Sequence, residues 1–387
     1  MISTLAIETS CDDTSLSLVR FDGTHFFVDA LLAYSQIDDH QQYGWVVPEF
    51  ASRLHSEKIL AVLQKIGLQH IEQIDFISVT THPGLPGSLV VGKAVAQFLA
   101  QYFDKPLVEV NHVYGHLFSL FLERDVQDIQ LPMLVLTASG GHNDIYLVDS
   151  LKHEARLPDG QAWSMKKDFW TSSFQLSTSW SEEKTKIESH TFGEYSIVRL
   201  WKTLDDAAGE CFDKVARMLW WPYPWGQWIS EKALERSRYL GREERREERR
   251  EELVQFKRIF LSKDWYDFSF SWMKSQVSFL LKELEDKNIP MTDSLIGDIA
   301  YEFQEAVVEV LVKKLVRAAI QYGAKTIGIA WWVSCNERLW EYLNEYGPSK
   351  IDDAVFLRPV KKVYSTDNGA MIWLAGILQR NDRKIGS

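Results

Sequence analysis

Glycine, cysteine and long apolar runs are all scarce in this sequence of 387 residues. The 21 glycines fall below the usual share of roughly 7%. The three cysteines, Cys11, Cys211 and Cys335, form no CxxC pair, which argues against a disulfide framework and favours a reducing, cytoplasmic setting. No stretch of about 20 apolar residues is present, so we expect no membrane span. The opening MISTLAIETS lacks a basic segment followed by an apolar one, so we expect no signal peptide.

Positive charge is also in short supply, because 43 Lys and Arg face 54 Asp and Glu, for a net charge of −11. This balance disfavours indiscriminate nucleic-acid binding, which depends on phosphate contacts. RNA binding through a local basic face, or together with partner proteins, stays open. Tryptophan, in contrast, occurs 15 times, more often than proline (11) or methionine (7). With 45% apolar and 25% charged residues, the chain has the composition of a globular protein.

The order of the predicted elements indicates an α/β fold with mixed sheets, and the length indicates two lobes. We place the first lobe at 1–130 and the second at 131–364, with a helix from about 365 packing back on the first. Two stretches, about 150–190 and 231–262, are predicted to be insertions. The second contains GREERREERREE, which favours a solvated, salt-bridged helix over an RNA-binding arm because its charges nearly cancel.

Periodicity assigns the individual elements. Strands are predicted at Thr4–Glu8, Ser15–Val19, His25–Val28, Phe76–Thr80, Pro106–Val110, Met133–Leu136, Asp144–Val148 and Lys325–Ala330. Helices are predicted at Ser88–Phe103, His112–Leu122, Asp205–Leu219, Asp298–Tyr322, Cys335–Leu343 and Gly369–Leu378.

His112 and His116 are four residues apart on a predicted helix, a spacing that lets two imidazoles reach one metal ion. The same pair could equally be packed without a metal, and a third ligand would have to come from elsewhere. No glutamate follows His112, so the general base of an HExxH metalloprotease is missing. Near the C-terminus, STDNG at 365–369 could cap the last helix or supply a metal-binding carboxylate.

Glycine-containing turns follow several predicted strands. GSLVVGK at 87–93 nearly matches a phosphate-binding P-loop, but Ala94 replaces the Mg²⁺-binding hydroxyl, so we favour a Pro/Gly turn leading into a core helix. The turns at 9–14 and 139–142 are small and polar, and one opens each predicted lobe. Backbone N–H groups in such turns can bind phosphates, so the pair predicts a nucleotide cleft.

The segment TLDDAAGECFDK at 203–214 has the composition of a capped helix, with Thr203 at the N-cap. Capping explains the early carboxylates without a functional role. Asp213 lies deeper in the helix and is the better functional candidate.

Taken together, these residues closely resemble the TsaD family, the tRNA N6-adenosine threonylcarbamoyltransferases, related to the Kae proteins of archaea and eukaryotes. The matching segments run in the family's order from residue 5 to residue 376. They are IETSCDDTS, VVPEFASRLH, PGLPGSL, NHVYGH, SGGH, TLDDAAGECFDKVAR, FSFS, VSCNERL and STDNGAMI.

The resemblance implies an actin-like ATPase fold of two RNase H-like lobes. It also implies transfer of threonylcarbamoyl from threonylcarbamoyl-adenylate to the N6 amine of the adenosine 3′ to the anticodon (position 37), in tRNAs that read codons starting with A. By the family's pattern, His112, His116 and Asp367 would bind one divalent metal, iron or alternatively zinc. The implied adenylate site comprises Thr137, Ala138, Ser139, Gly140, Gly141, Asp213, Gly226 and Asn336. Implied partners are tRNA and TsaB-like and TsaE-like proteins, in the cytoplasm.

Seven tryptophans stand where the family has glycine, namely Trp45, Trp201, Trp220, Trp225, Trp272, Trp331 and Trp332. Glycine readily adopts positive φ angles and lets the backbone approach a ligand closely, whereas tryptophan does neither. Random decay would also have touched the candidate ligands, which are intact. We therefore hypothesise that a codon this organism decodes as glycine, such as UGA, has been translated as tryptophan. If the tryptophans are real, activity is doubtful, and a non-catalytic nucleotide-binding scaffold becomes the rival interpretation.

Overall fold

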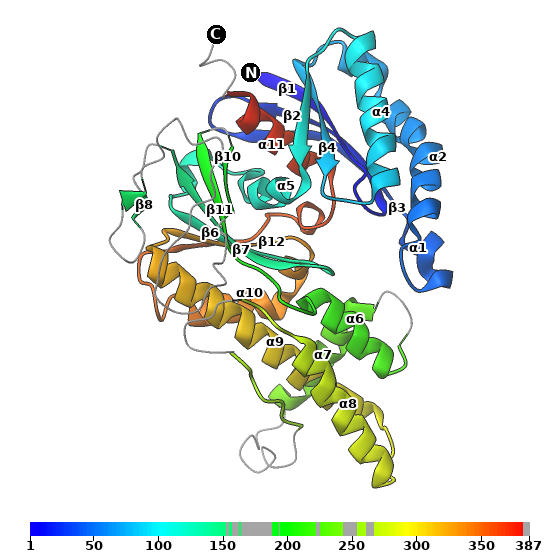
Figure 1. Ribbon diagram of the computed structural model, residues 1–387, viewed down its shortest axis with the longest axis vertical. Helices are drawn as coiled ribbons and strands as arrows, with labels where there is room; N and C mark the ends of the chain where they lie inside the picture. Colours follow the sequence, from blue (N-terminus) through cyan, green and yellow to red (C-terminus); the bar gives the residue numbers. More distant parts are fainter. Residues whose placement is uncertain are drawn as a thin grey trace, which may run out of the picture.

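The computed structural model describes residues 1–151, 155–156, 162–163, 188–192, 194–221, 225–242, 254–260 and 267–381. Two mixed β-sheets stand one above the other in Figure 1, each with helices on its faces. The first sheet has the order β3-β2-β1-β4-β5, with β1 (Ile2–Glu8), β2 (Asp13–Phe21), β3 (Phe26–Ser35), β4 (Phe76–His82) and β5 (Leu107–Asn111). The second has the order β10-β11-β7-β6-β12-β13, with β6 (Met133–Ala138), β7 (Asn143–Ser150), β10 (Glu188–Phe192), β11 (Tyr195–Trp201), β12 (Thr326–Ala330) and β13 (Val355–Leu357).

The same pattern of strand pairing occurs in both sheets. In the first, β1–β2 and β2–β3 are antiparallel, whereas β1–β4 and β4–β5 are parallel. In the second, β6–β7 and β7–β11 are antiparallel, whereas β6–β12 and β12–β13 are parallel. The turns after β1 and after β6 therefore occupy equivalent places. The predicted α/β class with two mixed sheets is confirmed, while the lobe bounds 1–130 and 131–364 stay a prediction.

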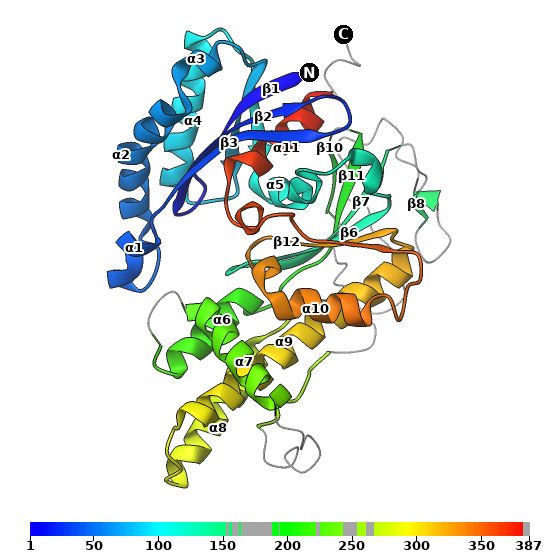
Figure 2. The same cartoon turned by 180° about the vertical axis from the view of Figure 1, so that it is seen from behind.

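Alternation along the strands decides how the helices cover the sheets. Leu5 and Ile7 of β1 point to one core cluster and Ala6 to another. Helices α2 (Pro48–Ile66) and α4 (Pro86–Tyr102) cover the outer face of the first sheet. Helices α5 (His112–Phe118) and α11 (Gly369–Asn381) share a core with the facing sides of both sheets, as the two opposite views show (Figures 1 and 2). The far side of the second sheet packs against α6 (Ala208–Met218), α7 (Trp225–Arg242), α8 (Ser271–Asp286), α9 (Asp293–Tyr322) and α10 (Glu337–Tyr346). Short helices α1 (Ile37–His40) and α3 (Leu68–Ile71) flank α2, and a two-stranded β8 (Ala155–Arg156) and β9 (Ala162–Trp163) stands apart.

Helix α4 begins at Pro86, so residues 87–93 are helical and do not form the loop of a P-loop; the favoured interpretation as a Pro/Gly turn before a helix is confirmed. Gly84 has a φ of 158° and its backbone lies against the Ser10 carbonyl. Lys93, the residue in the position of the P-loop lysine, pairs with Glu109 at 2.7 Å.

The prediction that Thr203 caps a helix from Asp205 is wrong. Helix α6 begins at Ala208 after the N-cap Ala207, and the Thr203 hydroxyl instead bonds both backbone groups of Asn143. Asp205 accepts hydrogen bonds from the backbone of Phe270 and the hydroxyl of Ser271, so it holds the start of α8. Thr203 and Asp205 therefore bond residues that are distant in the sequence instead of capping a helix. The prediction considered only the residues of the helix itself.

The second predicted insertion, 231–262, starts inside helix α7, and its bounds stay a prediction. Residues 231–242 continue α7, and Ala233 is completely buried there beside α9. The short described stretch 254–260 also joins the core through Phe256. Most of GREERREERREE and most of the first predicted insertion, 150–190, lie outside the described residues.

Candidate metal and substrate site

The two histidines lie on α5, which starts where β5 ends. Asn111 caps the helix, because its side-chain oxygen accepts the N–H of Val113 at 2.8 Å. His112 and His116 are then one turn apart and point to the same side. Both are buried, between the two sheets.

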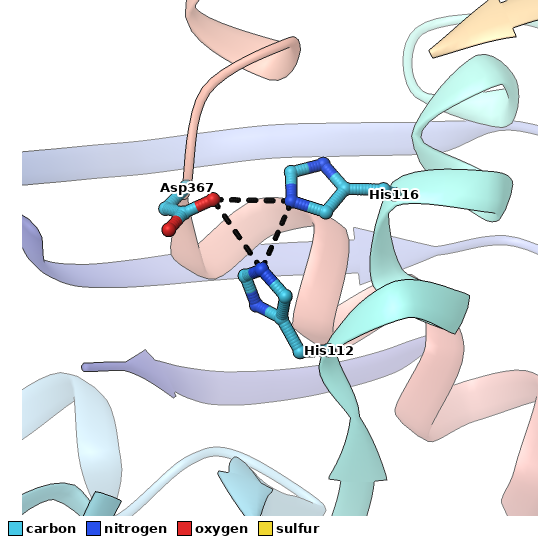
Figure 3. Close-up of side chains that lie close together, drawn as sticks. All are labelled: His112, His116 and Asp367. Carbon is cyan, nitrogen blue, oxygen red and sulfur yellow. Dashed lines mark hydrogen bonds and ion pairs between the residues drawn. The ribbon is translucent and has the colours of Figure 1, made fainter. Parts of the chain in front are cut away.

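Asp367 comes from the loop before α11 and meets both histidines, although 251 residues separate it from His116. Figure 3 shows the three side chains converging. The Nε2 atoms of His112 and His116 are 3.2 Å apart, and Oδ1 of Asp367 lies 3.1 Å from Nε2 of His116 and 3.5 Å from Nε2 of His112.

This triangle fits a metal ion. A circle through its three corners has a radius of about 1.9 Å, and zinc bonds to nitrogen and oxygen at roughly 2.0–2.2 Å. A point slightly above the plane is therefore at bonding distance from all three atoms. Two imidazoles and one carboxylate suit zinc or ferrous iron. In the described part of the chain, this is the group of His, Cys, Asp and Glu side chains whose geometry could hold an ion.

Glu8 is a part of the site that the sequence analysis did not assign. It ends β1, is completely buried, and its Oε2 lies 3.1 Å from Nδ1 of His112. The hydroxyl of Thr80 also donates to Glu8. A carboxylate on Nδ1 keeps the proton there and leaves Nε2 free as a ligand. The signal in the sequence was a charged residue directly after the apolar run at 5–7.

Negative charge gathers around the histidines. Burial is the main cause that raises the pKa of Asp12, and it also raises the pKa of Asp13 to about 7. Neighbouring carboxylates add to both increases. Burial lowers the pKa of His112, but the carboxylates of Asp367 and Glu8 outweigh it and raise the pKa to about 9. Burial also raises the pKa of Asp367, yet the two histidines hold it below its ordinary value. Such a cluster favours a bound cation.

The second part of the site begins at the turn after β6. The Ser139 hydroxyl accepts the N–H groups of Gly141 and His142, each at 3.2 Å, which fixes the turn. Gly140 and Gly141 have open space where a side chain would stand. Thr137 and Ala138 are the buried end of β6.

Helix α6 connects this turn to Asp213. The N–H of Gly209 donates to the Ser139 carbonyl at 3.2 Å, so the helix begins directly against the turn. One turn later, the Asp213 carboxylate accepts the N–H of Gly226 at 2.8 Å. Burial raises the pKa of Asp213 to about 6.

Asn336 has a structural task in addition to its predicted one. Its Oδ1 caps α10, and its amide nitrogen donates to Ser230 and Gln304 at 3.0 and 2.9 Å. Ser230 lies one turn beyond Gly226 on α7, so Asn336 borders the Asp213–Gly226 pair. Hydrogen bonds thus link the 139–142 turn to α6, Asp213 to Gly226, and Asn336 to α7, while the adenylate-binding role of these residues stays a prediction.

A family model described as TsaD, tRNA N6-adenosine threonylcarbamoyltransferase, matches residues 30–159 and 188–374. The chain belongs to the TsaD family. The tRNA N6-adenosine threonylcarbamoyltransferase of Staphylococcus aureus (strain Newman) is 34% identical over 376 residues, 96% of this chain and 90% of that protein. The protein of the same description from Staphylococcus epidermidis (strain ATCC 12228 / FDA PCI 1200) is also 34% identical, over 375 residues.

Among solved structures, HypF from T. kodakarensis superimposes on the whole chain with a TM-score of 0.51 at 12% identity. A second structure, of full-length HypF in the phosphate- and nucleotide-bound form, gives 0.51 at 13%. The chain spans about half the length of HypF, and this likeness concerns the fold alone. The expected actin-like ATPase class and the membership in a tRNA-modifying acyltransferase family are confirmed. Within the described residues, every helix is too short or too polar to cross a membrane.

Proposed function

We propose that this TsaD protein transfers threonylcarbamoyl from threonylcarbamoyl-adenylate to N6 of adenosine at position 37, in tRNAs that read codons starting with A. The observation that carries the proposal is the convergence of His112, His116 and Asp367 between the sheets, in a chain whose second sheet carries a fixed glycine turn after β6. The donor is a mixed anhydride and already activated, so the site needs no covalent nucleophile.

The reaction balances without a further co-reactant. The amine nitrogen forms a bond to the carbamoyl carbon, the bond from that carbon to the phosphate oxygen breaks, and AMP leaves. The amine loses one proton, which the phosphate of the departing AMP or water takes up. The adenosine has to leave its stack to reach a site between the lobes.

Each group of residues has a task in this scheme. His112, His116 and Asp367 hold the metal, iron or zinc, which polarises ligand oxygens when bound. The open space beside Gly140 and Gly141 receives the phosphate of the donor, which a side chain at either position would obstruct. Asp213 binds hydroxyls of the nucleoside.

Partners complete the proposal. The net charge of −11 provides no general attraction for tRNA, so we expect TsaB-like and TsaE-like proteins to share in holding it, in the cytoplasm. These partners follow from the family resemblance of the sequence.

Reconstitution tests the function. Iron- or zinc-loaded protein is incubated with threonylcarbamoyl-adenylate, the two partner proteins and unmodified tRNA, and the digested nucleosides are analysed by mass spectrometry. We expect N6-threonylcarbamoyladenosine together with AMP. Nucleotide binding without transfer would identify a scaffold, and peptide cleavage would identify a protease. Full-rate transfer after removal of the metal by a chelator would contradict the metal's role.

A further inference from the structure

Two tryptophans have backbone conformations that belong to glycine. Trp331, the first residue after β12, has φ 71° and ψ −173°, a region that only glycine commonly occupies. Trp220 has a φ of 60°. Three other residues that are not glycine also have positive φ. Asn288 and Asp104 tolerate it through short polar side chains, and the Glu123 carboxylate is held by Lys361 and Tyr364 at 2.7 and 2.8 Å. Tryptophan has no such compensation.

Trp220 stands at the glycine position of a helix-ending motif. Its N–H donates to the Arg217 carbonyl at 3.0 Å, and the N–H of Trp221 donates to the Ala216 carbonyl at 3.1 Å. These two bonds define a Schellman motif, in which the residue at the place of Trp220 is left-handed and most often glycine. The Trp220 side chain is 73% exposed, so packing does little to offset the backbone strain.

Trp331 lies against the candidate metal ligands. Its ring stacks on His116 with centroids 4.2 Å apart and planes 15° apart, and it meets His112 edge-on at 5.1 Å. An indole in contact with both rings reduces the room for the further ligands that a catalytic metal needs. The strained residue therefore also crowds the site.

Trp332 places a second indole beside Gly226 and Asp213. A Cβ built on Gly226 would lie 3.0 Å from Cη2 of Trp332 and 3.1 Å from Oδ1 of Asp213. The Trp332 ring thus lies against Gly226, beside the Asp213 carboxylate. Its own φ is not left-handed, so the backbone argument covers Trp220 and Trp331 only.

We propose that residues 220 and 331 are glycine in the protein that its own cells make, and that glycine at 331 leaves the His112–His116–Asp367 site open. Two positions far apart show the same mismatch, and the whole chain is short of glycine and rich in tryptophan. One decoding difference explains all three observations. The inference concerns residue identity and holds whatever group the site transfers.

Peptide mass spectrometry of the protein purified from the organism that carries the gene tests the identity directly. Trypsin releases residues 326–338, between Lys325 and Arg338, and residues 218–232, which begin after Arg217. We expect glycine at 331 and 220. Trp221 and Trp228 are internal controls in the second peptide, because they stack on each other at 4.0 Å on backbone that is not left-handed. Tryptophan at 220 and 331 would overturn the proposal.

Recombinant variants test the physical reasoning separately from activity. Trp220→Gly should raise the folding equilibrium constant roughly fivefold above Trp220→Ala, since only glycine removes the left-handed cost. Trp221→Gly, the matched control, should lower it. Equal stability of the two Trp220 variants would contradict the strain argument.

A titration with Co²⁺ as a spectroscopic probe tests the open site. Trp331→Gly should bind Co²⁺ roughly tenfold more tightly than the chain with tryptophan, a typical size for effects of a metal's surroundings. Unchanged Co²⁺ affinity would refute closure by the indole. If Trp331→Gly does not fold, residue 331 is not a glycine position and the proposal fails there.

Discussion

Replacing Gly209 by alanine tests whether α6 holds the Ser139 turn in place. The new Cβ would lie 2.5 Å from the Ser139 carbonyl oxygen, 2.7 Å from its carbon and 2.9 Å from Cα of Gly140. All three are backbone atoms, so no side chain can rotate away. Helix and turn have to separate, which also weakens the Gly209–Ser139 hydrogen bond.

Three energy terms decide whether Gly209→Ala raises or lowers the free energy of unfolding. Overpacking costs roughly 1–3 kcal/mol and a lost hydrogen bond about 1 kcal/mol. The higher helix propensity of alanine stabilises the folded state by at most about 1 kcal/mol, and by less in the first turn of a helix. We therefore expect Gly209→Ala to lower the free energy of unfolding by roughly 1–3 kcal/mol and to weaken AMP binding.

Urea unfolding and calorimetric titration with AMP measure the two effects. Gly297→Ala in α9 is the matched control, because its added Cβ would make only ordinary contacts with the Arg236 side chain, the nearest at 3.5 Å, and alanine suits a helix, so neither stability nor AMP affinity should fall. If Gly209→Ala matches this control in both stability and AMP affinity, then α6 does not position the turn and the reasoning fails.

Three further predictions concern buried charge. Glu8→Gln should weaken Co²⁺ binding roughly 10- to 100-fold, whereas Glu109→Gln at the surface should not change it; equal affinities would remove Glu8 from the site. Asp367→Ala should weaken Co²⁺ binding by more than Glu8→Gln, because a ligand is lost instead of its support, and the reverse order would argue against Asp367 as a ligand. Burial lowers the pKa of Lys314 to about 8, below the value of 10.5 in the unfolded chain. Between these two pH values the unfolded state binds more protons than the folded state, so Lys314 makes the free energy of unfolding rise with pH. Urea unfolding from pH 7 to 10 should show Lys314→Met lacking that rise, and parallel curves would refute the assignment.

Local patterns predicted the elements on which the site is built. The strand before His112 and the helix that follows were recognisable because apolar alternation and helical spacing involve neighbours only. The turn at 139–142 was predicted for the same reason. Helix boundaries failed where distant groups compete, as at Thr203, whose hydroxyl binds Asn143 instead of capping α6.

The sequence by itself determined the fold class, the family and the spacing of His112 and His116, because these depend on short-range order along the chain. Only the tertiary structure brought Asp367 to within 3.1 Å of His116 and set Glu8 behind His112, since those contacts arise from the packing of α5 and α11 between two sheets. The tertiary structure also showed where the shortage of glycine conflicts with the backbone conformation. It gave Trp331 a left-handed backbone beside the metal ligands, and a side chain's fit to φ and ψ becomes visible only once the chain is folded.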